Sequence, residues 1–242
     1  KERIWLSAPH ICGQEMKYIQ QALQSGWVTQ GGPNVEAFEL ETRRFLGGFV
    51  NCTAVSSGTA AIHLALRILG VGSGDVVICQ SLSFVASVNP VLYLGAVPVL
   101  VESEPKTWNI SPKYLEDAIV DCLEKGKIPK AIVAVCLYGM PYQIDEVAAI
   151  AAKYKIPVIE DSAEALGSKY KGRYCGTFGD ISVLSYNGNK MITTSGGGML
   201  ISKNTEYAEE ARFLATQARD KAPHYEHSEL GYNYRMSNVS AG

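Results

Sequence analysis

Short apolar runs alternate with longer amphipathic stretches along most of the chain, and this alternation limits the folds that are open to it. The run from Ala131 to Val135 is apolar throughout, which is typical of a strand covered on both faces of its sheet. Strands that alternate with helices assemble into mostly parallel sheets with helices on both sides. The sequence therefore predicts an α/β fold with three layers, α/β/α, around a mostly parallel seven-stranded sheet.

The same pattern predicts where the elements lie. Strands are expected at residues 51–56, 75–80, 97–102, 131–137, 157–161, 180–185 and 198–202. Helices are expected at residues 14–24, 35–45, 59–69, 84–94, 112–124, 145–154 and 206–217. Since no internal repeat or low-complexity linker divides the chain, we expect one domain over residues 1–242, including an N-terminal helical arm.

Charge and cysteine usage exclude several classes of protein. The net charge is −2 and the isoelectric point is about 6.1, so no overall field favours nucleic acid or an anionic membrane. No apolar run approaches the roughly 20 residues that cross a bilayer. The six cysteines are scattered without a Cys-x-x-Cys pair, which is typical of reduced thiols in a cytoplasmic protein. Neither they nor the four histidines have zinc-site spacing, so no metal is expected.

The ends of the predicted strands carry the candidate functional residues, because ligands of such sheets bind outside the carboxyl ends of the strands. Ser57-Gly58-Thr59 follows the first strand and opens a helix, so its backbone N–H groups could bind an anion. The same residues also fit an ordinary helix N-cap with a tight turn. Asp161 ends the fifth strand, where a partly desolvated carboxylate could keep a pyridine nitrogen protonated or could cap a helix.

Lys190 lies in the loop that follows the sixth strand and Ser185. The preceding Asn187-Gly188-Asn189 disfavours a helix, so the lysine is expected on a turn. A lysine held in such a place can act as a Schiff-base amine, although a lysine in a glycine- and asparagine-rich loop also fits a solvated surface charge. An anion-binding turn, a strand-terminal aspartate and a loop lysine are together what a pyridoxal phosphate site requires.

Competing motifs are incomplete. No Gly-x-Gly-x-x-Gly follows a strand, so the fingerprint of a nicotinamide-binding site is missing. A Walker A motif is missing too, because Lys190 is not preceded by glycine or followed by a hydroxyl residue. Tyr186 and Lys190 have the spacing of the short-chain dehydrogenase pair, but that pair needs a helix that Asn187-Gly188-Asn189 disfavours.

Separated motifs carry a resemblance to a known family. They are Ser25-Gly26-Trp27-Val28-Thr29-Gln30-Gly31, Ser57-Gly58-Thr59, Ser81-Leu82-Ser83-Phe84-Val85-Ala86, Glu160-Asp161-Ser162-Ala163-Glu164-Ala165, residues 185–198 and Gly231-Tyr232-Asn233-Tyr234-Arg235-Met236. With these residues the chain resembles the nucleotide-sugar aminotransferases of the DegT/DnrJ/EryC1/StrS family, which are fold-type-I pyridoxal phosphate enzymes and usually homodimers. The resemblance implies an aspartate-aminotransferase-like large domain. Relatives continue into a smaller C-terminal domain, which we expect to be absent from this chain.

The resemblance also implies a role for each candidate residue. Lys190 would form the Schiff base with pyridoxal 5′-phosphate, and Asp161 would pair with the pyridine nitrogen, so these two are the expected catalytic residues. Ser185 would bind the cofactor's phosphate together with the backbone of Gly58 and Thr59.

Three further residues would complete the cofactor site. Phe84 would stack on the ring, and Asn233 would reach the phosphate of the partner subunit's cofactor in a homodimer. Glu164 would lie beside the phenolic oxygen, where many relatives have glutamine. Similar glutamate variants favour UDP-linked 2-acetamido-4-keto-6-deoxy sugars as substrates.

The implied activity is transamination of a nucleotide-linked 4-keto-6-deoxy sugar, with L-glutamate as amino donor, in the biosynthesis of amino sugars or surface polysaccharides. Two alternatives stay open. One is a non-catalytic binding or scaffold protein with the same fold. The other is a relative of the sugar dehydratases, a branch in which a histidine is expected in place of Lys190.

Overall fold

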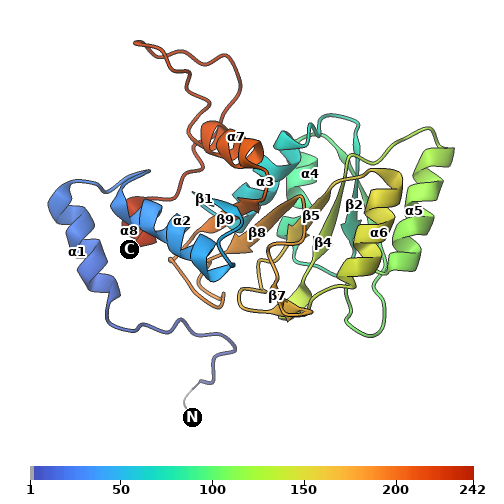
Figure 1. The fold of residues 1–242 in the computed structure, drawn as a ribbon, viewed down its shortest axis with the longest axis horizontal. Coiled ribbons are helices and arrows are strands. Elements are labelled where there is room, and N and C mark those ends of the chain that lie inside the picture. The colour runs from blue at the N-terminus through green and yellow to red at the C-terminus, as the bar shows by residue number, and fades with distance from the viewer. Residues whose placement is uncertain (1–2) are drawn as a thin grey trace.

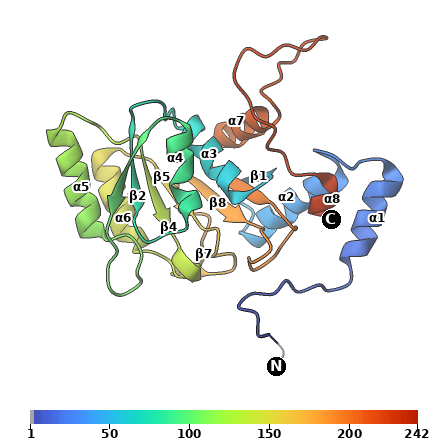
Figure 2. The ribbon, with the colours of Figure 1, turned by 180° about the vertical axis from the view of Figure 1, so that it is seen from behind.

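One seven-stranded sheet between two layers of helices forms the centre of the computed structural model, which describes residues 3–242 (Figures 1 and 2). Across the sheet, the strands are β1 (Asn51–Val55), β9 (Gly198–Ser202), β8 (Ile181–Ser185), β5 (Val158–Asp161), β4 (Ala131–Val135), β2 (Val76–Gln80) and β3 (Val97–Val101). Strand β9 is antiparallel to both of its neighbours, and the other pairings are parallel. The predicted α/β fold and mostly parallel seven-stranded sheet are confirmed. Residues 1–2 of the expected domain lie outside the described residues.

The helices cover both faces of the sheet, as the three-layer prediction required. One face packs against α3 (Gly58–Ile68), α4 (Asn89–Tyr93) and α7 (Thr205–Ala215). The other packs against α2 (Pro33–Phe45), α5 (Pro112–Glu124) and α6 (Ile144–Tyr154). Helix α1 (Glu15–Ser25) lies beside α8 (Asn238–Ala241) at the β1 end of the sheet (Figure 1). Each helix of residues 3–242 is too short or too polar to span a membrane.

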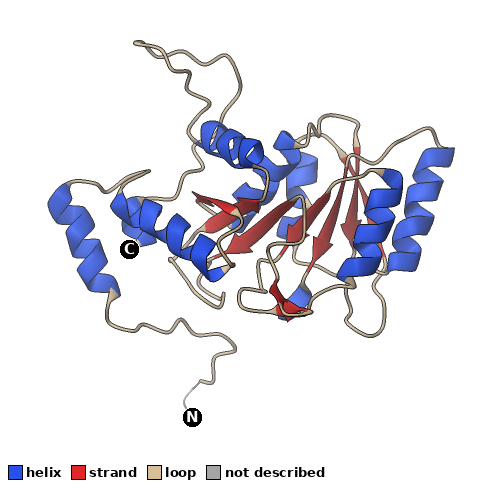
Figure 3. Ribbon diagram, in the orientation of Figure 1, coloured by secondary structure: helices blue, strands red, loops and turns tan. Residues whose placement is uncertain are grey.

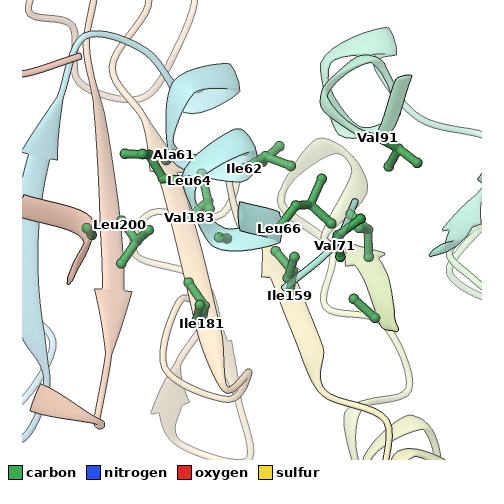
Figure 4. Close-up of a cluster of buried hydrophobic side chains, with 14 of the residues drawn as sticks. Ala61, Ile62, Leu64, Leu66, Val71, Val91, Ile159, Ile181, Val183 and Leu200 are labelled. Carbon is green, nitrogen blue, oxygen red and sulfur yellow. The ribbon is translucent and has the colours of Figure 1, made fainter. Parts of the chain in front are cut away.

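Alternation along each strand divides the core into two layers. Side chains of successive strand residues point to opposite faces, so Val183 packs under α3 while Leu184 packs with Val35 of α2. Under α3, Leu64 and Leu66 meet the inner strands in a cluster that Figure 4 shows. Both faces of β4 are buried, which is why its sequence shows no polar alternation.

Most predicted elements end within one or two residues of the observed ones, but the helix expected at 84–94 does not form as one piece. The structure has a 3₁₀ turn, Val85–Ser87, followed by the short helix α4. Pro90 is the reason, because it has no N–H to donate and its ring would clash with the carbonyl of Ala86 in a continuous helix. The break places Ser87 at the end of a turn instead of on a helix face.

The alternating pattern gave no signal for three short elements. They are the two-residue strands β6 (Lys169–Tyr170) and β7 (Arg173–Tyr174) and the 3₁₀ turn Leu137–Gly139. Ser237 caps helix α8, since its Oγ accepts a hydrogen bond from the backbone N–H of Ser240 at 3.0 Å. Between α7 and α8 a long loop projects away from the sheet (Figure 3).

Candidate active site

A cavity of about 650 Å³ opens at the carboxyl edge of the sheet, where the loops after β1, β2, β4, β5 and β8 meet. Parallel strands bring their carboxyl ends to the same edge, so residues far apart in the sequence converge there. Seven of the sequence-predicted residues line this cavity: Gly58, Thr59, Phe84, Asp161, Glu164, Ser185 and Lys190. Asn233 does not line it.

One end of the cavity is formed by the N-terminus of α3. Ser57 is the N-cap, and its Oγ accepts a hydrogen bond from the N–H of Ala60 at 3.0 Å. The N-cap alternative and the anion-binding alternative are therefore compatible, because Ser57 caps the N–H of Ala60 while Gly58 and Thr59 of the same turn line the cavity. A Cβ on Gly58 would lie 3.0 Å from Ser185 Cβ, tighter than an ordinary contact, so the absence of a side chain helps the helix start to lie close to that serine. The helix dipole and the Ser185 hydroxyl thus favour an anion at this end.

Asp161 also lines the cavity, and its side chain is buried. It is the last residue of β5, and its side chain points to the α3 face because Ile159, two residues earlier, packs there. Oδ2 accepts a hydrogen bond from Ser87 Oγ at 2.6 Å, and Oδ1 accepts one from the N–H of Ala163 at 3.1 Å. Burial raises the pKa of Asp161, and these hydrogen bonds and the charge of Lys190 oppose that rise.

Asp161 forms no salt bridge within residues 3–242. A desolvated carboxylate without a contacting cation is costly, so the position favours a ligand that brings a positive N–H to it.

Lys190 extends into the cavity from a turn. Its backbone N–H donates to the carbonyl of Asn187 at 3.0 Å, which is the turn that the Asn-Gly-Asn sequence predicted. Only 12% of its side chain is exposed, and Nζ lies 3.4 Å from Glu164 Oε1. Glu164 is itself held by the N–H of Tyr138, which donates to Oε2 at 2.8 Å. The lysine is therefore a positioned amine rather than a freely solvated charge.

Tyr186 does not share this environment. Its ring is buried, and it packs edge-to-face on Phe38 with the ring centres 4.8 Å apart. Residues 186–190 form a bend and a turn, not a helix, so Tyr186 and Lys190 do not present one face. The dehydrogenase spacing is a coincidence of sequence.

A second cluster, on the opposite face of the sheet, has a structural role. Cys136, Glu160 and Cys175 place their ligand atoms within 4.8 Å of one another. The Glu160 carboxylate already accepts hydrogen bonds from the hydroxyls of Ser162 and Ser182 and from the N–H groups of Gly176, Phe178 and Gly179. A hydrogen bond with Cys175 and burial also raise the pKa of the Cys136 thiol well above its ordinary value. These residues therefore fix the turn after β7 and are poor metal ligands.

Asn233 lies in the loop segment between α7 and α8. It is exposed and forms an antiparallel bridge with Thr216. Its exposure is compatible with a contact to another subunit, which stays a prediction.

The sequence reasoning missed three residues of the cavity region. Ser83 and Ser87 follow β2 and form hydrogen bonds toward Asp161, and Tyr138 follows β4 and binds Glu164 through its N–H. The strand-end rule could have pointed to these loops, since both follow strands of the parallel part of the sheet. Ser87 gave no separate signal because the pattern of residues 84–94 predicts one continuous helix, and Ser83 appeared only as part of the motif at residues 81–86.

Comparisons with known proteins give concordant results. A model of the DegT/DnrJ/EryC1/StrS aminotransferase family matches residues 9–242. EpsN of Bacillus subtilis (strain 168), named as a pyridoxal phosphate-dependent aminotransferase, is 53% identical over 241 residues, which are 100% of this chain and 62% of EpsN. A GDP-perosamine synthase of Escherichia coli O157:H7 is 40% identical over 96% of this chain and 62% of its own length.

Solved structures agree with these matches. A protein of Streptococcus pneumoniae named as a sugar aminotransferase, in its PMP form, superposes with a TM-score of 0.91 at 28% identity, over 99% of this chain and 64% of that chain. Helicobacter pylori PseC, an aminotransferase of pseudoaminic acid biosynthesis, superposes with a TM-score of 0.90 at 27% identity, over 99% of this chain and 63% of that chain. The chain spans less than two thirds of the length of these relatives.

Proposed function

Because the chain belongs to the DegT/DnrJ/EryC1/StrS aminotransferase family, we propose that it carries the cofactor site of a pyridoxal 5′-phosphate-dependent sugar aminotransferase. The proposed reaction moves an amino group from L-glutamate to a nucleotide-linked 4-keto-6-deoxy sugar, in the biosynthesis of amino sugars or surface polysaccharides. The observation that carries the proposal is the convergence of Lys190, Asp161 and the N-terminus of α3 on one cavity.

The residues of the cavity fit the cofactor at each of its functional groups. The N-terminus of α3, with the close approach of Gly58 to Ser185, suits a phosphate. The buried Asp161 carboxylate suits a protonated ring nitrogen, and the Lys190 amine suits a covalent bond to the cofactor. Phe84 is 69% exposed and lines the mouth of the cavity, where a ring face would be available for stacking on a bound heterocycle.

Bound pyridoxal phosphate would supply an electron sink for the pair released when a C–H bond next to nitrogen breaks. The protein's own task is to move the proton. Lys190 Nζ, once free, would take the proton from the amino-acid carbon and return it to the cofactor side, and the steps would reverse on the sugar. Glu164, 3.4 Å from Nζ, would keep the lysine directed into the cavity through each transfer. Asp161 would hold its negative charge at the ring nitrogen throughout.

The substrate proposal covers two nucleotide classes. Glu164, in the position where many relatives have glutamine, favours UDP-linked 2-acetamido-4-keto sugars. Two relatives with 40% and 38% identity are named GDP-perosamine synthases, which favours a GDP-linked 4-keto sugar. A panel of UDP-, dTDP- and GDP-linked 4-keto sugars with L-glutamate separates these classes by product formation.

We further propose that the full-length protein acts as a homodimer in which Asn233 serves the partner subunit's cofactor. Its exposed position outside the cavity of its own chain supports this arrangement. Residues 1–242 would form one cofactor-binding domain, and the scattered cysteines support a cytoplasmic location.

The test uses the full-length protein with pyridoxal phosphate. The wild type is expected to show the absorbance band near the visible edge that the cofactor has when it is bonded to a lysine, and Lys190→Ala is expected to lack that band. Adding L-glutamate to the wild type should convert the band to that of the aminated cofactor. An unchanged band in Lys190→Ala would refute the assignment.

Glutamate addition tests one of the two alternatives, and product analysis tests the other. A non-catalytic binding protein would keep its absorbance band when glutamate is added. A dehydratase relative would consume the 4-keto sugar without transferring nitrogen to it, so product analysis by mass spectrometry distinguishes it from an aminotransferase.

A further inference from the structure

Two serine hydroxyls form a chain that ends on the buried Asp161 carboxylate. Ser83 Oγ and Ser87 Oγ are 2.7 Å apart, and Ser87 Oγ lies 2.6 Å from Asp161 Oδ2. Ser87 and Asp161 are 2% and 4% exposed, so water does not compete for this contact. The two residues are 74 positions apart in the sequence, and the contact crosses from the loop after β2 to the end of β5.

The direction of this chain follows from the number of protons available. An ionised carboxylate only accepts hydrogen bonds, so the single Ser87 proton must go to Asp161. Ser87 Oγ is then an acceptor, and the Ser83 hydroxyl must donate to it. The carbonyl of Phe84, 3.3 Å from Ser83 Oγ, is the weaker alternative acceptor for that proton. A hydroxyl that donates to an ionised carboxylate stabilises its negative charge, so the chain favours the ionised form.

The backbone fixes the inner serine. Ser87 ends the 3₁₀ turn, and its N–H donates to the carbonyl of Phe84 at 3.0 Å. The break of the expected helix at Pro90 is what leaves this turn in place beside the cavity. Ser87 is therefore held toward Asp161 by local geometry and not by a freely rotating loop.

We propose that Ser87 is a positioning residue that keeps the Asp161 carboxylate ionised and aimed at the ring nitrogen of the cofactor, with Ser83 as the outer donor of the chain. The proposal rests on the proposed function for the nature of the ligand, but the hydroxyl chain itself is a property of the protein alone. Among residues 3–242, four groups face Asp161: the Ser87 hydroxyl, the N–H of Ala163, Lys190 and Glu164.

These neighbours determine the direction in which the pKa of Asp161 changes when the Ser87 hydroxyl is removed. Burial raises the pKa of Asp161, and the charge of Glu164 raises it further, whereas the hydrogen bond from Ser87, the N–H of Ala163 and the charge of Lys190 lower it. Removing the Ser87 hydroxyl deletes one lowering contribution, so the Asp161 pKa in Ser87→Ala must lie above that of the wild type. The neutral carboxyl would then appear at a higher pH, and a ring nitrogen facing it would lose its counter-charge.

The experiment titrates Asp161 in the full-length apoprotein by ¹³C NMR of aspartate-labelled carboxyl groups, with the signal assigned from its absence in Asp161→Asn. Ser87→Ala is expected to move the midpoint to higher pH, and Ser87→Thr, which keeps a hydroxyl, is expected to restore it. In the holoprotein, Ser87→Ala is expected to weaken cofactor affinity about tenfold, as the loss of one hydrogen bond to a charged group predicts.

Ser81→Ala is the matched control, because Ser81 Oγ also donates to a carboxylate, that of Glu102 at 3.1 Å, in the same loop but on the exposed surface. In Ser81→Ala, the pH midpoint of the Asp161 titration should equal that of the wild type. An unchanged midpoint in a folded Ser87→Ala overturns the inference. If Ser87→Ala does not fold, Ser83→Ala provides the test. A smaller upward shift of the Asp161 midpoint in Ser83→Ala supports the hydroxyl chain, and an unchanged midpoint overturns the inference.

The apoprotein titration needs no cofactor, so it remains informative if pyridoxal phosphate does not bind. If the wild type binds the cofactor and Ser87→Ala changes neither the Asp161 midpoint nor the cofactor affinity, only the role of Ser87 is overturned and the proposed function stands.

Discussion

Single glycines set how closely the backbone segments around the cavity approach one another. A Cβ on Gly198, the first residue of β9, would lie 2.4 Å from both the carbonyl carbon and oxygen of Ser57. Those are backbone atoms at the N-cap of α3, and they cannot move without moving the helix. At Gly58 the nearest atom is Ser185 Cβ, at 3.0 Å, so a shift of only a few tenths of an ångström would relieve the contact. The two glycines therefore differ in what a methyl group would displace.

Gly198→Ala is expected to lower the free energy of unfolding by about 1–3 kcal/mol, because the added methyl group must push α3 away from the sheet. The same displacement moves the anion-binding end of the cavity, so cofactor affinity is expected to fall by about tenfold or more, the equivalent of at least 1.4 kcal/mol. Urea denaturation and a cofactor titration of the full-length protein measure the two effects.

Gly188→Ala serves as the control for stability. A Cβ at Gly188 meets nothing within 4 Å, and its φ lies outside the left-handed region. Its free energy of unfolding should stay within about 0.5 kcal/mol of the wild type, the usual range for a surface substitution. Equal losses of unfolding free energy in Gly198→Ala and Gly188→Ala would show that the close approach at Gly198 does not cause the destabilisation.

At the scale of elements, helix α3 is joined to the segment of residues 231–236 by an aromatic cluster. His63 of α3 is buried, with Nδ1 3.2 Å from the hydroxyl of Tyr234 and its ring centre 4.8 Å from that of Tyr232. The rings of Tyr232 and Tyr234 stack on each other with centres 5.0 Å apart. The backbone N–H of Ser56 also donates to the carbonyl of Tyr234 at 2.7 Å. These contacts hold the segment that carries Asn233 against the start of α3.

The stability of this junction is expected to depend on pH. Burial, and then the nearby charge of Arg67, lower the pKa of His63 below its ordinary value of 6.5. Between the lowered pKa and 6.5 the unfolded chain binds more protons, so the free energy of unfolding falls as the pH drops below about 6.5. We predict that the stability advantage of the wild type over His63→Gln shrinks between pH 7 and pH 5 in urea denaturation.

His224→Gln provides a comparison, since His224 lies in the projecting loop with 70% of its side chain exposed. A constant difference for His63→Gln would show that the buried ring does not titrate in this range. Asp161 contributes to the pH dependence of the free energy of unfolding with the opposite sign, because burial raises its pKa. The wild type and both histidine variants retain Asp161, so this contribution cancels when they are compared.

At the scale of the whole molecule, the cavity of one chain holds the expected catalytic residues, while Asn233 is exposed outside it. If Asn233 serves the partner's cofactor, the functional unit is a pair of chains and not one chain. A two-fold dimer would place two such sites across one interface, each with residues of both subunits.

Mixing two inactive variants tests this arrangement. Full-length Lys190→Ala and Asn233→Ala are each expected to lose most transaminase activity. A mixed dimer would combine Lys190 of one chain with Asn233 of the other in one intact site, so activity should return after subunit exchange. Activity is measured as product formed from L-glutamate and the 4-keto sugar found in the substrate panel.

The control for this experiment mixes Lys190→Ala with a double variant that carries both substitutions. No pairing of those chains restores a complete site, so activity should stay absent. Failure of the first mixture to recover activity, with mixed dimers present by mass spectrometry, would contradict a role for Asn233 across an interface.

The sequence by itself determined the class of fold and the order of its elements. The uniform apolar runs of strands such as β4 and the amphipathic stretches between them are local features, and they predicted every strand of the large sheet. The strand-end rule, which needs only the order of strands and helices along the chain, then placed Asp161, Lys190 and the start of α3 at one edge. Turn chemistry at Asn187-Gly188-Asn189 likewise predicted that Lys190 lies outside a helix.

Only the tertiary structure decided which side chains meet. The contact of Ser87 with Asp161 depends on strand order across the sheet and on the interruption at Pro90, and periodicity carries information on neither. The approach of Gly198 to Ser57 and the junction of His63 with Tyr234 likewise join segments that are far apart in the chain. Periodicity reports which face of an element is buried, whereas the pairing of buried groups follows from three-dimensional packing, because each contact depends on where several elements lie at once.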